Sequence, residues 1–353
     1  MNICISKDYI NLNPSHILNY YTSIIWHTKY NEIGDFEICI PIIDNEMLED
    51  IEVNDLVWLT NDFSDVRIIN TIKLQYNIEN GYNIVISGYS FSYILNNRIV
   101  WDQSNYNDYV SNIIYDLIRK NCINSSNTSR NLSNFIIDTN YHKDTIIQAQ
   151  YQGENLSEVI KNLASQYNFG YKIEYVSNKF IFRLFEGNNY TSNQDFNIVF
   201  SEKLGNLLEY NINLDNSNYR NSALILGEGQ GTSRVSVEVS GNSGYSRKEL
   251  YVNASELSQN KDSDLQVIQL SEYRKMLKQN GESYLENYKT DFKFDCKLYT
   301  DMYKFKQDYY VGDKVSIITN FVYNNSNVVH GLITEVVESW SDNGYECLPT
   351  INF

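Results

Sequence analysis

The sequence has few cysteines, few prolines and no long apolar run. Only three of its 353 residues are proline. No stretch approaches the roughly 18 apolar residues that a membrane helix needs, and the N-terminus lacks the basic and apolar segments of a signal peptide. The cysteines are scattered, odd in number and without a CxxC pair, so we expect reduced, buried thiols and neither disulfides nor a metal cluster. They are Cys4, Cys39, Cys122, Cys296 and Cys347.

Positive charge is also scarce. The chain has 28 Lys and Arg against 44 Asp and Glu, a formal net charge of −16. This balance argues against a nucleic-acid-binding surface and against docking on anionic lipid, because both depend on clustered basic side chains. An acidic wall would instead suit a channel through which DNA passes without sticking. An acidic surface that simply keeps a soluble protein from associating is the plainer interpretation, and both stay open.

Recognisable catalytic and metal-binding patterns are missing as well. The four histidines show neither HExxH nor HxH spacing, which favours packing or surface roles over a zinc site. They are His16, His27, His142 and His330. The glycines of Gly227-x-Gly229-x-Gly231 lack the Lys-Ser/Thr of a phosphate loop and precede a strand, so we expect a turn.

Other candidate groups also have plainer explanations. Ser243 lies in Gly-Asn-Ser-Gly, which is not a nucleophile elbow. The pairs Glu49-Asp50 and Asp262 with Asp264 lie in polar stretches, where solvated or helix-capping carboxylates are expected instead of an acid–base pair. We therefore predict that the chain is not an enzyme, that it has no catalytic, cofactor-binding or metal-binding residues, and that it uses no cofactor.

Short strands separated by turns dominate the first hundred residues. Hydrophobic residues make up 42% of the chain, enough to build cores, and the length fits two to four domains. The pattern is typical of a small barrel or sandwich, so we predict a first β-barrel over residues 1–100. The expected strands are 17–30, 36–40 (before Pro41), 56–59, 66–72 and 82–87, with Asn80-Gly81 as a hairpin turn.

A different pattern predicts an α+β insertion lobe over residues 101–205. Apolar residues at helical spacing indicate a first helix over 106–120, and a capping box indicates a second helix that starts at Asn155. The expected boundaries are Asn105 or Asp108 as the cap of the first helix, Asn155 with Glu158 as the capping box of the second, Gly170 as its end, and 171–176 with 180–185 as a hairpin.

Strands resume at residue 206. We predict a second β-barrel from 206–240 and 290–353, with 241–289 inserted as a helical piece. Within that insertion a long helix is expected over 263–288. Gly281 lies inside this helix, where glycine costs roughly 1 kcal/mol relative to alanine, so a kink or close packing is expected. The apolar stripe of the helix is Leu270, Tyr273, Leu277, Tyr284 and Tyr288, and the strands before it are 208–214, 222–226 and 234–239.

The two strand-rich ends contain a repeat. Val53-Asn54-Asp55-Leu56-Val57 corresponds to Val311-Gly312-Asp313-Lys314-Val315, and a strand and then an Asn-Gly-Tyr turn follow in each copy, at Gly81 and at Gly344. The shared order favours a true duplication over chance, with a longer loop at 320–327 explaining the one difference in spacing. The predicted fold is mainly β with α+β insertions and two similar tube-like β-barrels. Three copies of such a chain would form a ring of six barrels.

Several segments together resemble a tail-hub family of phages of Gram-positive bacteria, of the tail-associated-lysin N-terminal type. The resemblance runs from about residue 17 to the end, and the combination of segments is fairly specific. The segments are Ser23–Glu37 (SIIWHTKYNEIGDFE), Gly88–Trp101 (GYSFSYILNNRIVW), Asn206-Leu207 with Asn221 and Gly227–Gly229, Arg247–Ala254 (RKELYVNA), Tyr310–Val315 (YVGDKV) and Ile333–Val336 (ITEV).

The resemblance implies a fold similar to the central hub of contractile-tail baseplates and to the hub half of type VI secretion spikes. Those proteins are trimers with two tube-like barrels per chain, and many relatives continue into a peptidoglycan-cutting domain. This sequence ends at Phe353, so we expect any wall-cutting function on another protein. The implied partners are two further copies of the chain, the tail tube or tube-initiator protein, the tape measure protein, the tip or spike protein and surrounding wedge proteins. DNA would pass through the lumen unbound, and no membrane binding is expected.

We therefore predict a homotrimeric structural hub that joins a sixfold tail tube to a threefold tip, located in the baseplate of a phage or phage-like tail and assembled in the bacterial cytoplasm. Asp and Glu side chains are expected to line a negative lumen, and one ring of each pair Tyr20-Tyr21 and Tyr309-Tyr310 to face a neighbouring subunit. Three alternatives stay open: a peptidoglycan-acting enzyme, a host-glycan-binding tail protein, and a peripheral wedge component in six copies. The prediction covers contractile and non-contractile particles, and phages as well as tail-like bacteriocins.

Overall fold

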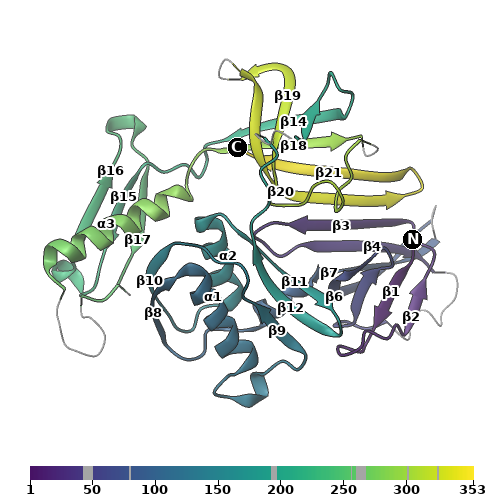
Figure 1. Ribbon diagram of the computed structural model, residues 1–353, viewed down its shortest axis with the longest axis horizontal. Coiled ribbons are helices and arrows are strands. Elements are labelled where there is room, and N and C mark those ends of the chain that lie inside the picture. Colours follow the sequence, from purple (N-terminus) through teal and green to yellow (C-terminus); the bar gives the residue numbers. More distant parts are fainter. Residues whose placement is uncertain are drawn as a thin grey trace.

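The structure, a computed structural model, consists mainly of β-strands (Figure 1). One large sheet draws strands from both ends of the chain, and two smaller lobes that contain helices stand off it. The mainly β class with α+β insertions is therefore confirmed. The structure describes residues 1–42, 51–78, 81–191, 197–255, 257–259, 268–299, 302–323 and 326–353.

The N-terminal part of the chain forms the first β-module. Alternating apolar residues bury one face of its strands, as in β4, where Phe36, Ile38 and Ile40 are buried. The expected strands are present, except that the predicted strand 17–30 is divided between two strands. The strands are β1 (Ile3–Ser6), β2 (His16–Leu18), β3 (Ser23–Lys29), β4 (Asp35–Pro41), β5 (Leu56–Leu59), β6 (Asp62–Asn77) and β7 (Gly81–Ser90).

The C-terminal part, together with two strands from the middle of the chain, forms the second β-module. Its strand order β14-β18-β21-β20 repeats the order β3-β4-β7-β6 of the first module. In addition, β19 pairs with the first half of β20, as β5 pairs with the first half of β6. The strands are β13 (Val199–Ser201), β14 (Leu207–Asp215), β18 (Asp291–Leu298), β19 (Lys314–Tyr323), β20 (Ser326–Ser341) and β21 (Gly344–Asn352).

The two modules match in register as well as in strand order. In each module the long hairpin carries a β-bulge directly after an isoleucine, Ile69 in β6 and Ile333 in β20. The same isoleucine donates its backbone N–H to the carbonyl of the aspartate before the neighbouring strand, Asp55 or Asp313, at 2.9 Å in both cases. A bulge is a specific local feature, and two unrelated sheets would not repeat it together with the same hydrogen bond. The duplication predicted from the sequence is therefore confirmed.

The modules share one sheet. β3 of the first module pairs antiparallel with the second half of β20, with Lys29 opposite Glu335 and Ser23 opposite Ser341. The strand path runs from β14 through β18, β21, β20, β3, β4, β7, β6, β5 and β1 to β2, and it does not return to its start among the described strands. The two tube-like barrels expected from the sequence therefore take the form of two joined, open modules.

The first lobe builds its core from two helices and a three-stranded sheet. Asn155 caps α2 as predicted, but α2 ends before Asn168, which is left-handed, and Gly170 already starts β11. The first helix starts later than predicted, because residues 104–109 form a strand paired with β10. Neither Asn105 nor Asp108 caps it; Tyr109 occupies that position. The elements are β8 (Ser104–Tyr109), α1 (Val110–Ile118), β9 (Phe135–Asp138), β10 (Ile146–Tyr151), α2 (Leu156–Tyr167), β11 (Gly170–Val176) and β12 (Lys179–Phe185), with short 3-10 or π-helical turns at Phe91–Asn97, Arg119–Ile123 and Thr128–Arg130.

The second lobe is a three-stranded sheet with α3 packed on one face. Its core includes Tyr273 and Leu277 of α3, while Leu270 and Tyr284 of the predicted stripe are largely exposed. Gly281 is the point of close packing, since a Cβ there would lie 2.4 Å from the Ile225 side chain. The elements are β15 (Ser222–Leu226), β16 (Ser236–Ser240), β17 (Glu249–Asn253) and α3 (Leu270–Glu286), with 3-10 turns at Gly231–Ser233 and Gly244–Ser246.

Two boundaries differ from those expected. Of the segment 206–240 assigned to the second barrel, only β14 joins the large sheet, because β15 pairs with β16 and β17 of its own lobe. Residues 320–323 and 326–327, expected in a loop, continue β19 and β20, and 324–325 lie outside the described residues. The expected helix start at 263 also lies outside them.

Candidate assembly interface

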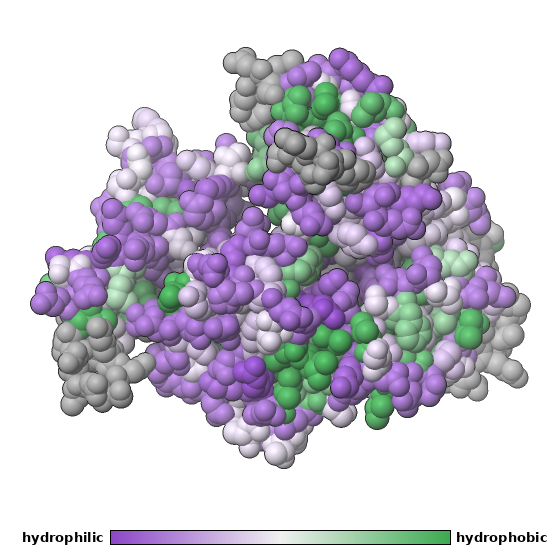
Figure 2. All heavy atoms as spheres, in the orientation of Figure 1, coloured by the Kyte–Doolittle hydropathy of each residue, from purple (hydrophilic) through white to green (hydrophobic). Residues whose placement is uncertain are grey.

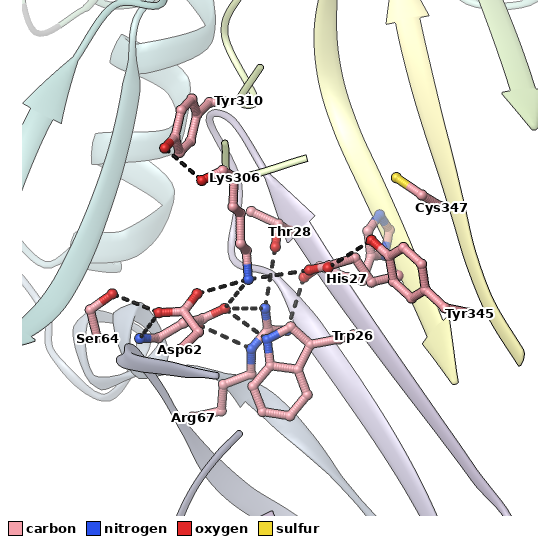
Figure 3. A network of polar contacts seen from close by, with 12 residues as sticks. Trp26, His27, Thr28, Asp62, Ser64, Arg67, Lys306, Tyr310, Tyr345 and Cys347 are labelled. Atoms are coloured by element: carbon pink, nitrogen blue, oxygen red, sulfur yellow. Dashed lines mark hydrogen bonds and ion pairs between the residues drawn. The ribbon is translucent and has the colours of Figure 1, made fainter. Parts of the chain in front are cut away.

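A buried joint holds the two β-modules together. We define the inter-module joint as β3, residues 335–341 of β20, and the charged side chains of β6 and of the loop before β19 that cover this pairing. On the buried face of the joint, Ile24, Trp26 and Val336 are almost completely inaccessible to solvent. Figure 3 shows the polar side chains that converge there.

Lys306 lies at the centre of the polar network. Its Nζ is 2.9 Å from a carboxylate oxygen of Asp62, 3.2 Å from Glu338 and 3.6 Å from Asp65. Asp62 and Asp65 belong to the first module, and Lys306 and Glu338 to the second. One ammonium group therefore bridges carboxylates on both sides of the joint.

Arg67 completes the network from β6. Its side chain is only 1% exposed, and its guanidinium carbon lies 4.1 Å from the centre of the Trp26 ring. The guanidinium donates to Asp65 at 3.0 Å and to the backbone carbonyl of His27 at 2.9 Å. The indole N–H of Trp26 donates to Asp65 at 2.7 Å. These bonds satisfy the buried charges that apolar surroundings would otherwise disfavour.

The ionisation of the network follows from these contacts. Burial alone would raise the pKa of Asp65, but Arg67 and Lys306 outweigh it and hold that pKa well below the usual range of a carboxyl. Burial alone would lower the pKa of Lys306, but Asp65, Glu338 and Asp62 raise it above the usual value of a lysine. Asp65 and Lys306 are therefore charged at neutral pH and hold each other in place.

His27 forms a second, smaller ionic group on the opposite face of β3. Its Nδ1 is 3.2 Å from Asp35 and its Nε2 is 3.0 Å from Glu335 of the other module. Burial alone would lower the pKa of His27, but the hydrogen bonds to Asp35 and Glu335 raise it above 6.5. The hydrogen bond from His27 in turn lowers the pKa of Asp35 to about 2. Of the four predicted candidate histidines, this is the one that contributes to the joint.

The arrangement is suited to holding the two modules in a fixed position. A cavity of about 690 Å³ lies beside the joint and is lined by both modules and by the first lobe. Two acidic groups on its wall are ion-paired, Glu338 with Lys306 and Glu186 with Lys143. A third, Asp313, accepts the backbone N–H groups of Asn188 and Tyr310. A general acid or base needs a group that can change its protonation during a reaction. At Glu186 burial alone would raise the pKa, but the ion pair with Lys143 lowers it and so opposes such a change.

The structure does not bring the other predicted candidates together. His16 lies beside Ser15, His142 beside Asp144, and His330 beside Ser316. In the part of the chain that the structure describes, no group of three or more His, Cys, Asp or Glu is placed to hold a metal ion. Nor does any described helix combine the length and the apolar character needed to cross a membrane.

The glycine and serine candidates have structural roles. Gly229 and Gly231 have positive φ and lead through a 3-10 turn into β16, so this segment is the turn that was predicted. Ser243 precedes another 3-10 turn, and its carbonyl accepts a hydrogen bond from the Ser246 hydroxyl. The carboxylate pairs Glu49-Asp50 and Asp262 with Asp264 lie outside the described residues.

The tyrosine pairs behave differently from each other. Tyr309 is buried and Tyr310 is 47% exposed, as expected for rings on opposite faces. Tyr20 and Tyr21 are both partly buried against the core of the first module, so that pair does not divide between two faces. All five cysteines are free; Cys39 is partly buried and the other four are buried.

Among the described strands, two of the open edges of the large sheet lie at β14 and in the second half of β6. β14 pairs only with β18, and residues 71–77 of β6 pair only with β7. Both edges expose large apolar side chains: Leu214 is 50% exposed, Leu74 56% and Tyr76 64%. Figure 2 shows hydrophobic side chains gathered at the end of the molecule where Figure 1 places β14, β18 and β19. Unpaired strands with exposed apolar side chains are sites at which another chain can add.

A family model decides the relationship of this chain to known proteins. Residues 10–351 match the model described as Siphovirus ReqiPepy6 Gp37-like protein. The chain belongs to the Siphovirus ReqiPepy6 Gp37-like family. The match covers both modules and both lobes, so the resemblance to a phage tail family found in the sequence is confirmed. No curated protein sequence matches the chain.

Solved structures of phage tail proteins share the fold of this Gp37-like chain. The tail protein from Neisseria meningitidis MC58 has a TM-score of 0.60 at 12% identity, covering 100% of this chain and 96% of that one. The 43 kDa tail protein of prophage MuSo2 from Shewanella oneidensis has a TM-score of 0.59 at 12% identity, covering 99% and 98%. A chain of the lidless PdpA–VgrG complex has a TM-score of 0.53 at 12% identity, covering 99% of this chain and 64% of that one. At such identities the likeness concerns the fold, which is that of phage tail proteins.

Proposed function

We propose that the chain is the structural hub of a phage or phage-like tail baseplate and that three copies form a ring. The observation that carries this proposal is the in-register duplication of the β-module. Three chains with two similar modules each supply six similar units around a threefold axis. Such a ring presents near-sixfold geometry to a tail tube and threefold geometry to a tip.

The inter-module joint supports this role. A ring of six units requires a fixed angle between neighbouring modules, including the two modules of one chain. The buried bridge from Lys306 to Asp62 and Glu338 holds that angle, because moving either module would separate buried charges from their partners. A hub that carries mechanical load benefits from such a rigid connection.

The proposed partners follow from the proposed position. One side of the ring would meet the tail tube or tube-initiator protein and the tape measure protein, and the other side the tip or spike protein. The two lobes would offer surfaces to surrounding wedge proteins. The net charge of −16 suits a lumen through which DNA passes without binding. We assign no enzymatic role: among the carboxylates around the cavity, Glu338 and Glu186 are held in ion pairs, and Asp313 accepts backbone N–H groups of two neighbouring loops.

Native mass spectrometry of the purified chain, combined with counting its copies in tails by image reconstruction, tests the proposal. Three copies per tail support the hub, and six copies would support a peripheral wedge component instead. Incubation with purified peptidoglycan and a glycan array distinguish the remaining alternatives. Release of soluble wall fragments or specific glycan binding would contradict a purely structural role.

A further inference from the structure

We propose that β14 of one chain pairs antiparallel with residues 71–77 of β6 in the next chain, in a register that the internal β3–β20 pairing defines. The inference rests on the proposed ring and names the surface that closes it. The occupant of each of these two edges is thus a second copy of this chain.

β14 occupies in the second module the place that β3 occupies in the first. In each module, one residue of the strand next to the bulge pairs with the bulge isoleucine, and a phenylalanine of the following strand pairs with that residue. These phenylalanines are Phe36 of β4 and Phe294 of β18, which are therefore equivalent. Trp26 faces Phe36, and Ile212 faces Phe294. Ile212 of β14 therefore corresponds to Trp26 of β3. Trp26 is 1% exposed because β20 covers that edge, whereas β14 has no such neighbour among the described strands.

The second half of β6 occupies the place of the second half of β20. Thr71 and Glu335 are the first paired residues after the bulge in their hairpins. In β20 the following segment, 335–341, pairs with β21 on one side and with β3 on the other. In β6 the corresponding segment, 71–77, pairs with β7 only. Each module thus provides one strand of the joint. Among the described strands of each chain, β14, with one edge unpaired, remains as the counterpart of β3, and residues 71–77 of β6, likewise with one edge unpaired, remain as the counterpart of residues 335–341 of β20.

The internal register predicts which residues face one another between chains. Because Glu335 faces Lys29 and Glu338 faces Trp26, the equivalent residues Thr71 and Leu74 face Asp215 and Ile212 of the next chain. The complete set is Thr71 with Asp215, Ile72 with Leu214, Lys73 with Asn213, Leu74 with Ile212, Gln75 with Asn211 and Tyr76 with Tyr210.

Side-chain chemistry supports this register independently. The mapping uses backbone pairing alone. Within the six paired positions it nevertheless sets the three apolar residues of one strand opposite the three apolar residues of the other, and polar residues opposite polar ones. These apolar pairs lie on the face that corresponds to the buried face of the joint, where Ile24, Trp26 and Val336 lie. A slip by one residue would instead place Leu74 beside Asn213 or Asn211 and turn the apolar residues of one strand to the other face.

The charges of the two edges are compatible with the pairing. Lys73 would lie diagonally from Asp215, within reach of a long side chain across an antiparallel pair. The interface joins two different surfaces of the chain, so repeated use generates either a closed ring or an open filament. Closure after three chains corresponds to the ring under the proposed function.

Disulfide cross-linking tests the register directly. In a Cys39→Ser background, Leu74→Cys combined with Ile212→Cys, and separately Lys73→Cys combined with Asn213→Cys, set two thiols opposite each other in neighbouring chains. Six strands separate the two positions within one chain, so a bond between them links different chains. The matched control is Leu74→Cys with Asn213→Cys, whose side chains would lie on opposite faces.

We expect mild oxidation of both facing pairs to produce a ladder on non-reducing gels that ends at a covalent trimer, and the control to stay uncross-linked. A trimer in native mass spectra without cross-linking of the facing pairs would overturn the edge pairing and leave the ring intact. A ladder that continues past three chains would support the pairing and contradict the threefold ring. A chain that stays monomeric and uncross-linked at its highest soluble concentration would contradict both.

A second pair of variants tests the apolar contact. Leu214→Asp places a charge opposite Ile72. Burying a leucine side chain stabilises an interface by more free energy than a tenfold change in affinity requires, so we expect self-association to weaken by at least about tenfold. Leu224→Asp changes a similarly exposed leucine of the second lobe, at 48% against 50%, and should leave self-association unchanged. Equal effects of the two variants would overturn the proposed site.

Discussion

Asp55 and Asp313 close the same hydrogen-bonded turn at the start of equivalent strands in the two β-modules. The carboxylate of each accepts the backbone N–H of the residue three positions earlier, Glu52 at 2.9 Å and Tyr310 at 2.7 Å. Asp313 accepts a further backbone N–H, from Asn188, also at 2.7 Å. Burial raises the pKa of both carboxyls. The shared turn is a local sign of the duplication. The additional hydrogen bond to Asp313 makes the turn in the second module the more stable of the two.

Replacing these aspartates should therefore have unequal effects. Asp313→Ala removes the acceptor of two partly buried hydrogen bonds, and Asp55→Ala that of one, at about 1 kcal/mol for each bond. We expect urea unfolding to show a loss of about 2 kcal/mol or more for Asp313→Ala and about half of that for Asp55→Ala. The corresponding Asn variants keep an acceptor and should lose less. Equal losses for the two Ala variants would contradict the assigned hydrogen bonds.

Lys306 is expected to stabilise the joint through its charge. Lys306→Met keeps most of the side-chain volume but leaves Asp65 and Glu338 without their bridging cation. Removing one partner of a mostly buried ionic network is costly, so we expect the free energy of unfolding to fall by about 2 kcal/mol or more. The control is Lys304→Met, because Lys304 is exposed and its change should be nearly neutral. Similar unfolding curves for both variants would show that the network does not hold the modules together.

The His27 group predicts a maximum of stability at mildly acidic pH. The pKa of His27 is raised in the folded chain, so its contribution is complete below about 6.5 and is lost as the pH rises through the raised value. The pKa values of Asp35 and Glu335 are lowered, so their contributions are complete above about 4 to 4.5 and are lost as the pH falls through the lowered values. Lys29, which pairs with Asp35, adds positive charge beside this group.

Melting temperatures measured from pH 4 to 9 for the natural chain and for His27→Gln check this expectation. The natural chain should lose stability above about pH 6.5, and the variant should lose less over the same range. Since Asp35 and Glu335 are partly exposed, the difference should not exceed about 1 kcal/mol. A variant that keeps the full loss of stability above pH 6.5 would exclude His27 as its source.

Gly281 should be an exception to the usual benefit of alanine in a helix. Alanine is favoured over glycine by about 1 kcal/mol in helix interiors, but a methyl group here would lie 2.4 Å from the Ile225 side chain. We expect Gly281→Ala to destabilise the second lobe, as overpacking costs about 1 to 3 kcal/mol, and Ile225→Val to restore part of the loss. Gln279→Ala, at an exposed position of α3, should be neutral or slightly stabilising. Stabilisation by Gly281→Ala would show that α3 does not pack this closely on β15.

Features encoded by local or repeated patterns were predictable from the sequence. The side chain of Asn155 accepts hydrogen bonds at the start of α2 as its capping box indicates, and β5 occupies the predicted residues 56–59. The duplication was also visible, because the turn around Asp55 and the turn around Asp313 use similar residues. The start of α1 was misjudged, since residues 104–109 form a strand only through their pairing with β10, a contact that helical spacing does not reveal.

The joint itself was not predictable in the same way. Lys306, Asp65 and Glu338 come from three distant segments, and no short motif connects them. One available signal was the occurrence of charged residues, Asp65 and Arg67, within a strand whose neighbours are apolar and buried. Likewise, β14 and β15 have similar patterns, and only their pairing partners decide that one belongs to the large sheet and the other to a lobe.

Image reconstruction of an intact tail or of the assembled chain tests the central claim most directly. Our account predicts three copies around the axis, with six β-modules in one ring and β14 of each chain beside β6 of the next. Six copies of the chain, or three copies whose modules lie at unequal radii with both sheet edges unpaired, would contradict it.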